Sequence, residues 1–209
     1  SGGFGNQLFM ILNIISLSLK YNKIPLFFVN NFYYNNYHVK RKTPYDYSLL
    51  KKISFNNLCD LNFDYKIYEE EQFAFKEITL DSNFNTTVLG YFQSYKYFWD
   101  FKEEIKKFLT IDYNIINSIK QKFKTFEKKI ISIHIRLGDY VNLQEYHHLC
   151  SLEYYEIALS KYNLNDYKII VFSDDIDAAR KKISPLNIDF LSADDLFKND
   201  EYQLYMLML

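Results

Sequence analysis

Cysteine, glycine and arginine are all scarce in this sequence of 209 residues. The only two cysteines, Cys59 and Cys150, are too few for a disulfide framework, and they form no CxxC pair of the kind that binds zinc. We therefore expect two buried thiols in a reducing, cytoplasmic compartment, and peripheral association with a membrane stays open.

Long hydrophobic runs and an excess of one charge are also missing. No uninterrupted apolar run reaches about 18 residues, so we expect no segment of this chain to span a bilayer. A formal net charge of -1 argues against nucleic acid as a partner. Hydrophobic residues nevertheless make up 48% of the chain, which is enough for a globular protein with a substantial core.

Hydrophobic periodicity predicts an α/β protein in which helices alternate with strands. Such an alternation implies parallel sheets, and ligands bind such sheets at the carboxyl ends of the strands. Residues 30–66 are expected to form a loop with short elements. Helices are expected over residues 6–21, 98–108, 115–126, 151–162, 176–183 and from 194 onward, and strands over 26–29, 87–89, 130–135, 168–172 and 188–191.

The five glycines are concentrated in three short segments, each at an expected strand end. They are Gly2, Gly3, Gly5, Gly90 and Gly138. Ordinary turns in this chain use Asn, Asp and Ser, so the glycines indicate places where the backbone turns sharply or approaches a ligand. The first segment leads into a helix, and its free N–H groups could bind an anion or a sugar. A plain tight turn explains that segment equally well.

The segment around Gly138 contains three side chains that could bind a ligand or take part in catalysis. His134 and Arg136 are two residues apart on an expected strand and so share one face, with Asp139 following the glycine. A guanidinium at a strand end suits a bidentate grip on a pyrophosphate. The alternative is a structural Arg136–Asp139 ion pair with His134 packed in the core.

Carboxylates gather at the end of the next expected strand, in Ser173, Asp174 and Asp175. They could accept hydrogen bonds from a ribose or from the N1–H and 2-amino groups of guanine. Capping of the following helix explains them equally well. Asp175 and Asp177 also have the D-x-D spacing that holds a metal in other transferases, although their helical context weakens that reading.

Four segments together resemble motifs of glycosyltransferase family eleven, the α-1,2-fucosyltransferases. In chain order they are Gly2–Phe9, Gly90–Phe98 (GYFQS-KYF in the family), His134–Tyr140 (HxRRGDY) and Val171–Asp175 (FSDD). Leu137 stands where the third motif has its second arginine. The family's C-terminal NS-FSWW stretch is absent from this sequence.

The resemblance implies a GT-B-like fold with two Rossmann-like lobes, an inverting transfer and no required metal or other cofactor. The donor would be GDP-β-L-fucose and the acceptor the 2-hydroxyl of a galactoside or similar glycan. Arg136 would bind the pyrophosphate and stabilise the departing diphosphate, while His134 and Asp139 shape the pocket and are both candidates for the base. The further donor-binding residues would be Gly3, Phe4, Gly5, Asn6, Gly138, Ser173, Asp174 and Asp175.

Two other functions remain open. One is a metal-dependent nucleotide-sugar transferase that uses Asp175 and Asp177, and the other is a non-catalytic protein that only binds glycans. His147 and His148 lack a third metal ligand at useful spacing, which favours a surface or acceptor-side pair over a zinc site.

We expect two lobes, an acceptor-side lobe over residues 1–127 and a donor-binding lobe over 128–209. The helix over 6–21 needs a preceding strand, and the last helix ends on an apolar run. We therefore expect a first lobe without its first strand, a truncated second lobe, an unfilled strand position beside the first helix and an uncovered apolar face on the last one. An isolated chain of this kind should lack useful transfer activity.

Overall fold

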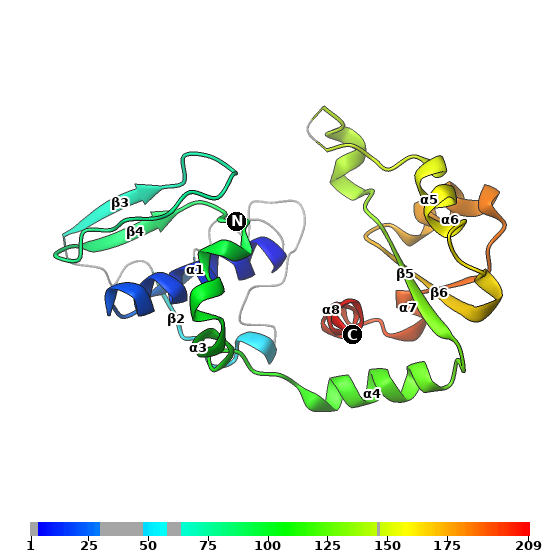
Figure 1. Cartoon of the computed structure of the whole chain (residues 1–209), viewed down its shortest axis with the longest axis horizontal. Coiled ribbons are helices and arrows are strands. Elements are labelled where there is room, and N and C mark those ends of the chain that lie inside the picture. Colours follow the sequence, from blue (N-terminus) through cyan, green and yellow to red (C-terminus); the bar gives the residue numbers. More distant parts are fainter. Residues whose placement is uncertain (1–3, 30–47, 58–63, 146) are drawn as a thin grey trace. The chain divides into compact units, whose positions relative to one another are not determined.

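The computed structural model describes residues 4–29, 48–57, 64–145 and 147–209 (Figure 1). It confirms a mixed α/β protein, and every strand pair in the described residues is parallel. The chain divides into two compact units, residues 1–112 and 113–209, which are described separately. The division falls before the expected boundary at residue 127, because α4 (Tyr113–Lys124) packs on the sheet of the second unit.

The described part of the first unit contains one long helix, two separate pairs of strands and several short helical turns. Strand β1 pairs with β2, and β3 pairs with β4. The elements are α1 (Phe4–Tyr21), β1 (Phe27–Val29), η2 (Ser48–Leu50), β2 (Phe55–Asn57), β3 (Tyr65–Glu69), β4 (Asn85–Leu89), η4 (Tyr95–Tyr97), η5 (Trp99–Phe101) and α3 (Lys102–Lys106).

The middle of helix α1 is buried in the first unit. Ile11 and Ile15 pack in one cluster with Leu50 and Ile105. Even Asn13, on the polar face of the helix, is fully buried. Helix α1 is followed by Asn22, which takes the left-handed φ of 51° that commonly ends a helix.

One expectation for the first unit was wrong in detail. The helix predicted over residues 98–108 is a 3-10 turn followed by the short α3, although Ile105 is buried as its spacing indicated. Strand β3 begins at the end of residues 30–66, where a loop with short elements was expected, and continues beyond them. Its side chains are mostly exposed, with Ile67 62% exposed, so it lacks the alternating apolar pattern that marks a half-buried strand. The expected vacancy beside α1 concerns chain before Phe4 and lies outside the described residues.

The second unit is a three-stranded parallel sheet in the order β5-β6-β7 with helices on both faces. Because β6 is the middle strand, its carboxyl end lies directly beside that of β5. The elements are α4, β5 (Lys129–Ile135), η6 (Gly138–Asn142), α5 (Leu152–Leu159), η7 (Leu164–Asp166), β6 (Tyr167–Ser173), α6 (Ile176–Ile183), η8 (Ser184–Leu186), β7 (Phe190–Ser192), α7 (Ala193–Leu196) and α8 (Asp200–Met208).

Alternate residues of β6 build the two cores of this unit. Ile169 and Val171 face the cluster that contains α5 and α6, whereas Ile170 and Phe172 face the cluster that contains α4 and α8. Figure 1 shows α5 and α6 on one side of β5 and β6, with α7 and α8 on the other. A strand buried on both faces needs an unbroken apolar run, which explains why residues 168–172 were recognisable from sequence.

The final helical segment is interrupted, contrary to the single helix expected from residue 194. Ser192 caps α7 and Asn199 caps α8, and each side chain accepts a hydrogen bond from a backbone N–H of its helix. Tyr205 and Met206 are buried against the sheet. The apolar side chains of residues 207–209 are 49–62% exposed, so exposure is limited to the end of this helix.

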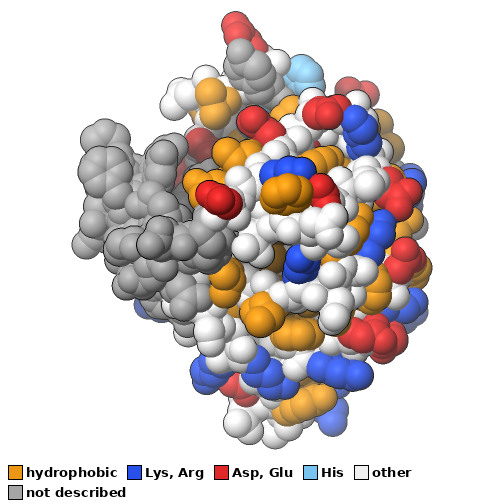
Figure 2. Space-filling view, turned by 90° about the vertical axis from the view of Figure 1, so that its left-hand side faces the viewer, with side chains coloured by type: hydrophobic (Ala, Val, Ile, Leu, Met, Phe, Trp, Pro, Cys, Tyr) orange, Lys and Arg blue, Asp and Glu red, His pale blue; other side chains and the backbone are white. Residues whose placement is uncertain are grey.

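The surface mixes polar and apolar groups. On the face shown in Figure 2, hydrophobic side chains lie among Lys, Arg, Asp and Glu, as the balanced composition predicts. Among the described residues, no helix is both long enough and apolar enough to cross a membrane.

Cys150 is exposed, so the expectation of a buried thiol was wrong at this position, and Cys59 lies outside the described residues.

Candidate active site

Two of the segments singled out in the sequence meet at the carboxyl end of the sheet in the second unit. The parallel register pairs Ile135 with Ser173, the last residues of β5 and β6. The Ser173 hydroxyl donates to the Ile135 carbonyl over 2.7 Å and fastens the two strand ends together. The polar residues that follow each strand are therefore neighbours, as the carboxyl-end rule predicts.

Arg136 lies at the centre of this end and binds two carboxylates. Its Nη2 donates to Asp139 Oδ1 over 2.7 Å, and its Nη1 is 2.9 Å from Asp174 Oδ2. The guanidinium carbon also lies 5.2 Å from the centre of the Tyr140 ring. The side chain is still 38% exposed. A guanidinium has five N–H donors, so two carboxylates can fix its orientation while other donors stay available to a ligand.

Asp174 joins the two segments through the backbone as well. Its Oδ1 accepts a hydrogen bond of 2.9 Å from the N–H of Leu137, while its Oδ2 pairs with Arg136. Gly138 packs directly against the same carboxylate, which leaves no room for a β-carbon. The need for glycine at residue 138 therefore comes from this contact.

Asp175 caps helix α6, as one of the two readings of this segment predicted. Its Oδ1 accepts from the N–H of Ala178 over 3.0 Å, and its own N–H donates to Ser173 Oγ over 3.1 Å. A cap on one carboxylate oxygen leaves the other with lone pairs for a further hydrogen bond. Capping and ligand recognition are thus compatible at this residue.

The side chains on the two faces of β5 and of the residues that follow it differ in burial. Ile133, Ile135 and Leu137 enter the hydrophobic cluster beneath α5, and Leu137 is only 6% exposed. His134 is exposed instead, so its expected alternative place in the core is wrong. Residue 137 is an interior position, which suits leucine. Arg136 points instead to the carboxyl end of the sheet, where the candidate site lies.

A ring stack beside Arg136 could not be anticipated from sequence. Tyr140 and His147 lie parallel, with centroids 4.1 Å apart and planes 8° from parallel. Tyr140 thus has the Arg136 guanidinium close to its ring and the His147 imidazole stacked upon it. A separation of seven residues would align two side chains along one helix, but only Tyr140 lies in a helical turn, η6 (Gly138–Asn142), so the spacing did not indicate this contact.

The remaining predicted site residues belong to the first unit. Asn6 Oδ1 accepts a hydrogen bond of 2.7 Å from Gln93 Nε2, so the glycine-rich opening and the segment after Gly90 are in contact. Phe4 and Gly5 start helix α1, whereas Gly3 lies outside the described residues.

The turn after β4 is also built around a glycine. Gly90 has a φ of 150°, which favours residues without a β-carbon. The Glu70 carboxylate accepts hydrogen bonds from the backbone N–H groups of Tyr91 and Phe92, at 2.7 and 3.0 Å. The second glycine segment thus has a structural function that needs no ligand.

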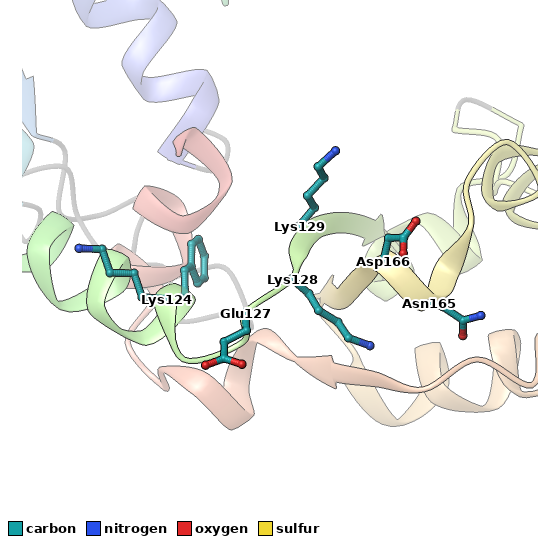
Figure 3. A pocket seen from close by; sticks show the side chains of 7 residues that line it. Lys124, Glu127, Lys128, Lys129, Asn165 and Asp166 are labelled. Carbon is teal, nitrogen blue, oxygen red and sulfur yellow. The ribbon is translucent and has the colours of Figure 1, made fainter.

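A hollow of about 630 Å³ lies at the opposite end of the β5-β6-β7 sheet in the second unit (Figure 3). Its lining includes Lys124, Glu127, Lys128, Lys129 and Asp166, near the amino ends of β5 and β6. Figure 3 shows these side chains pointing in different directions instead of converging. Ligands of parallel sheets bind at the carboxyl ends of the strands, so we assign the candidate site to the end that carries Arg136.

No group of three or more His, Cys, Asp or Glu side chains in the described chain could hold a metal ion.

The parallel sheet with helices on both faces and polar side chains at its strand ends defines a Rossmann-like α/β unit. Comparison with known sequences identifies the family within this class. The model of glycosyl transferase family 11 matches residues 2–206, so the chain belongs to this family, and the resemblance of its four motifs is confirmed.

One curated relative extends this result. The alpha-1,2-colitosyltransferase of Escherichia coli is 31% identical over 134 residues, an alignment that covers 61% of this chain and 46% of the relative. The aligned part therefore spans about half the length of that protein. No solved structure matches the chain.

Proposed function

We propose that this chain is part of an inverting α-1,2-fucosyltransferase that transfers L-fucose from GDP-β-L-fucose to the 2-hydroxyl of a galactoside or similar glycan. Membership of glycosyl transferase family 11 supports a nucleotide-sugar donor and a glycan acceptor. The division into two α/β units with parallel strands supports a GT-B-like arrangement of two lobes.

The orientation of Arg136 is the observation that carries the donor assignment. Two carboxylates and a tyrosine ring hold the guanidinium at the ends of adjacent strands, with 38% of the side chain exposed. A diphosphate leaving group accumulates negative charge as the glycosidic bond breaks, and a fixed cation stabilises that charge. In this proposal Arg136 binds the pyrophosphate, and Asp174 and Asp175 accept hydrogen bonds from the guanosine.

An inverting transfer also needs a base for the acceptor hydroxyl. As the base takes the proton, the acceptor oxygen forms its bond to the anomeric carbon and GDP departs with the electrons of the old bond. His134 and Asp139 are the candidates in the second unit. His134 is exposed on the face of β5 that also carries Arg136, whereas Asp139 is already engaged by that arginine.

The curated relative makes colitose the competing donor sugar, since its name assigns colitose transfer to that enzyme. Colitose is L-fucose without the 3-hydroxyl. A site built to hydrogen-bond a hydroxyl discriminates strongly against a sugar that lacks it, while an apolar pocket discriminates weakly. The ratio of affinities for GDP-L-fucose and GDP-colitose therefore separates the two donors.

The test is calorimetric titration of the purified chain with GDP, GDP-L-fucose, GDP-colitose and UDP-galactose. We expect heat from the three guanine nucleotides, with GDP-L-fucose binding most tightly, and little heat from UDP-galactose. Absence of GDP binding would contradict the proposal and favour the non-catalytic glycan-binding protein. Binding of UDP-galactose that requires manganese and disappears with EDTA would favour the metal-dependent alternative through Asp175 and Asp177.

A further inference from the structure

A second hollow, in the first unit, is lined by exposed aromatic rings. It measures about 610 Å³, within the range of roughly 300–1,000 Å³ that is common for ligand sites. Phe75, Tyr95 and Trp99, here called the aromatic platform, line it together with Lys96 and Asp100. The three rings are 40%, 55% and 52% exposed. Clustered exposed rings forgo the free energy of burial, so their grouping indicates an interaction site.

The platform rings contact one another or a buried neighbour. Tyr97 is buried and lies 4.9 Å from Phe75, centroid to centroid. The Tyr97 hydroxyl accepts a hydrogen bond of 3.2 Å from the backbone N–H of Lys76. Tyr95 meets Trp99 edge to face at 5.5 Å. Fixed rings lose little conformational entropy when a ligand binds, which favours a preformed site.

Charged groups surround the rings. Lys102 Nζ lies 3.9 Å from the centre of the Trp99 ring, and Lys96 Nζ lies 5.7 Å from that of Phe75. Asp100 adds a carboxylate to the same lining. A wholly apolar partner would bury these charges without hydrogen bonds, at a substantial cost in free energy. A pyranose is a better match, because its C–H face can stack on a ring while its hydroxyls reach the charged rim.

We propose that the aromatic platform is a glycan-binding subsite that holds one pyranose ring of the acceptor through stacking on Trp99 and Tyr95. The proposal rests on the proposed function, which supplies the need for a glycan acceptor. The Trp99 indole N–H and the Tyr95 hydroxyl add donors beside the stacking faces. Lys96 and Asp100 bind hydroxyl groups at the edge of the sugar.

The chain itself provides a direct probe, since Trp99 is its only tryptophan. Titrating the purified chain with lactose and N-acetyllactosamine should change the intrinsic tryptophan emission saturably. Tyr95→Ala should weaken the apparent affinity roughly three- to tenfold, which is the size expected for loss of an aromatic contact. Tyr154→Ala is the matched control, because Tyr154 is 57% exposed and meets Tyr155 edge to face at 5.2 Å in the other unit.

The outcomes separate this subsite from the donor assignment, because GDP binding is measured independently by calorimetry. A saturable emission change that Tyr95→Ala weakens and Tyr154→Ala does not would support the platform. No emission change up to high millimolar sugar overturns it, and retained GDP heat would then show that the donor proposal stands alone. An emission change that follows protein concentration in the absence of sugar would also overturn it, by showing that a second copy covers the rings.

Discussion

The Asp174 carboxylate occupies the space that a side chain on residue 138 would need. An ideal β-carbon on Gly138 would lie 3.1 Å from Asp174 Cγ and closer still to Oδ2. The carboxylate cannot simply rotate away, because the N–H of Leu137 and the guanidinium of Arg136 both hold it. Gly138 therefore supports the orientation of Arg136 through a residue on the neighbouring strand end.

Gly138→Ala should displace Asp174 and release Arg136 from one of its carboxylates. We expect a loss of about 1–2 kcal/mol in the free energy of unfolding, since the broken contacts are charged but partly exposed. Thermal unfolding followed by circular dichroism measures this loss. Gly5→Ala is the control for stability, because a β-carbon there meets nothing within 4 Å. Equal melting temperatures for the two variants would contradict the crowding argument.

Arg136→Lys should keep the positive charge but lose the planar fork. We expect calorimetry to show GDP binding weaker by about 1–3 kcal/mol, the size of hydrogen bonds to charged groups. Arg180→Lys is a close control, since Arg180 pairs with Asp195 over 2.9 Å and lies 5.2 Å from the Phe190 ring. Its side chain is 43% exposed, compared with 38% for Arg136. The same GDP affinity in the Arg136 variant and in the unmodified chain would remove this residue from pyrophosphate binding.

Asp175→Asn separates capping from nucleotide recognition, because asparagine caps helices as well as aspartate does. The variant should unfold at nearly the same temperature as the unmodified chain. Its preference for GDP over ADP and UDP in a competition assay should nevertheless fall roughly tenfold, since a neutral amide is a weaker acceptor for the guanine N–H groups. Asp177→Asn, on the same helix, should leave that preference unchanged. A preference that survives in the Asp175 variant would leave this residue with capping alone.

The capping box of α7 should make the free energy of unfolding depend on pH. Asp195 Oδ2 accepts from the N–H of Ser192 over 3.0 Å, and Ser192 Oγ accepts from the N–H of Asp195 over 3.1 Å. The side chain and backbone of Ser192, followed by the charge of Arg180, lower the pKa of Asp195 below its ordinary value of 3.8. The stabilisation is therefore complete above about pH 4 and is lost as the pH falls through the lowered pKa.

Urea unfolding at pH 7 and pH 3 tests this dependence. Asp195→Asn should reduce the unfolding midpoint at pH 7 and lose less stability than the unmodified chain on acidification. Asp189→Asn is the control, because Asp189 is 91% exposed in its pair with Lys168 and such pairs contribute little. An acid dependence that Asp195→Asn leaves unchanged would show that other carboxylates control it.

Local patterns were sufficient to predict much of the second unit, including the strands that carry the candidate site residues. The predicted strand over residues 168–172 contains the apolar run 169–172, which needs burial on both faces, and β6 buries it on both faces. A helix was predicted over residues 151–162, and α5 (Leu152–Leu159) lies there, with the Ser151 side chain accepting from the N–H of Tyr154. These features depend on residues a few positions apart, so the sequence contains the whole signal.

Features with exposed or irregular backbone were harder to predict. Strand β3 has few buried side chains, and the aromatic residues near 98–108 form 3-10 turns although their spacing is helical. In both places, pairing and packing with distant residues override the local pattern.

The sequence by itself determined the α/β class, the helices and strands with strong apolar periodicity, and the residue types available for binding an anion. Only the tertiary structure decided which partners these residues have. It placed Asp174 against both Gly138 and Arg136, and it stacked His147 on Tyr140. The physical reason is that periodicity reports which face of an element is buried, whereas contacts between side chains depend on how strand ends and loops are brought together by the packing of the whole unit.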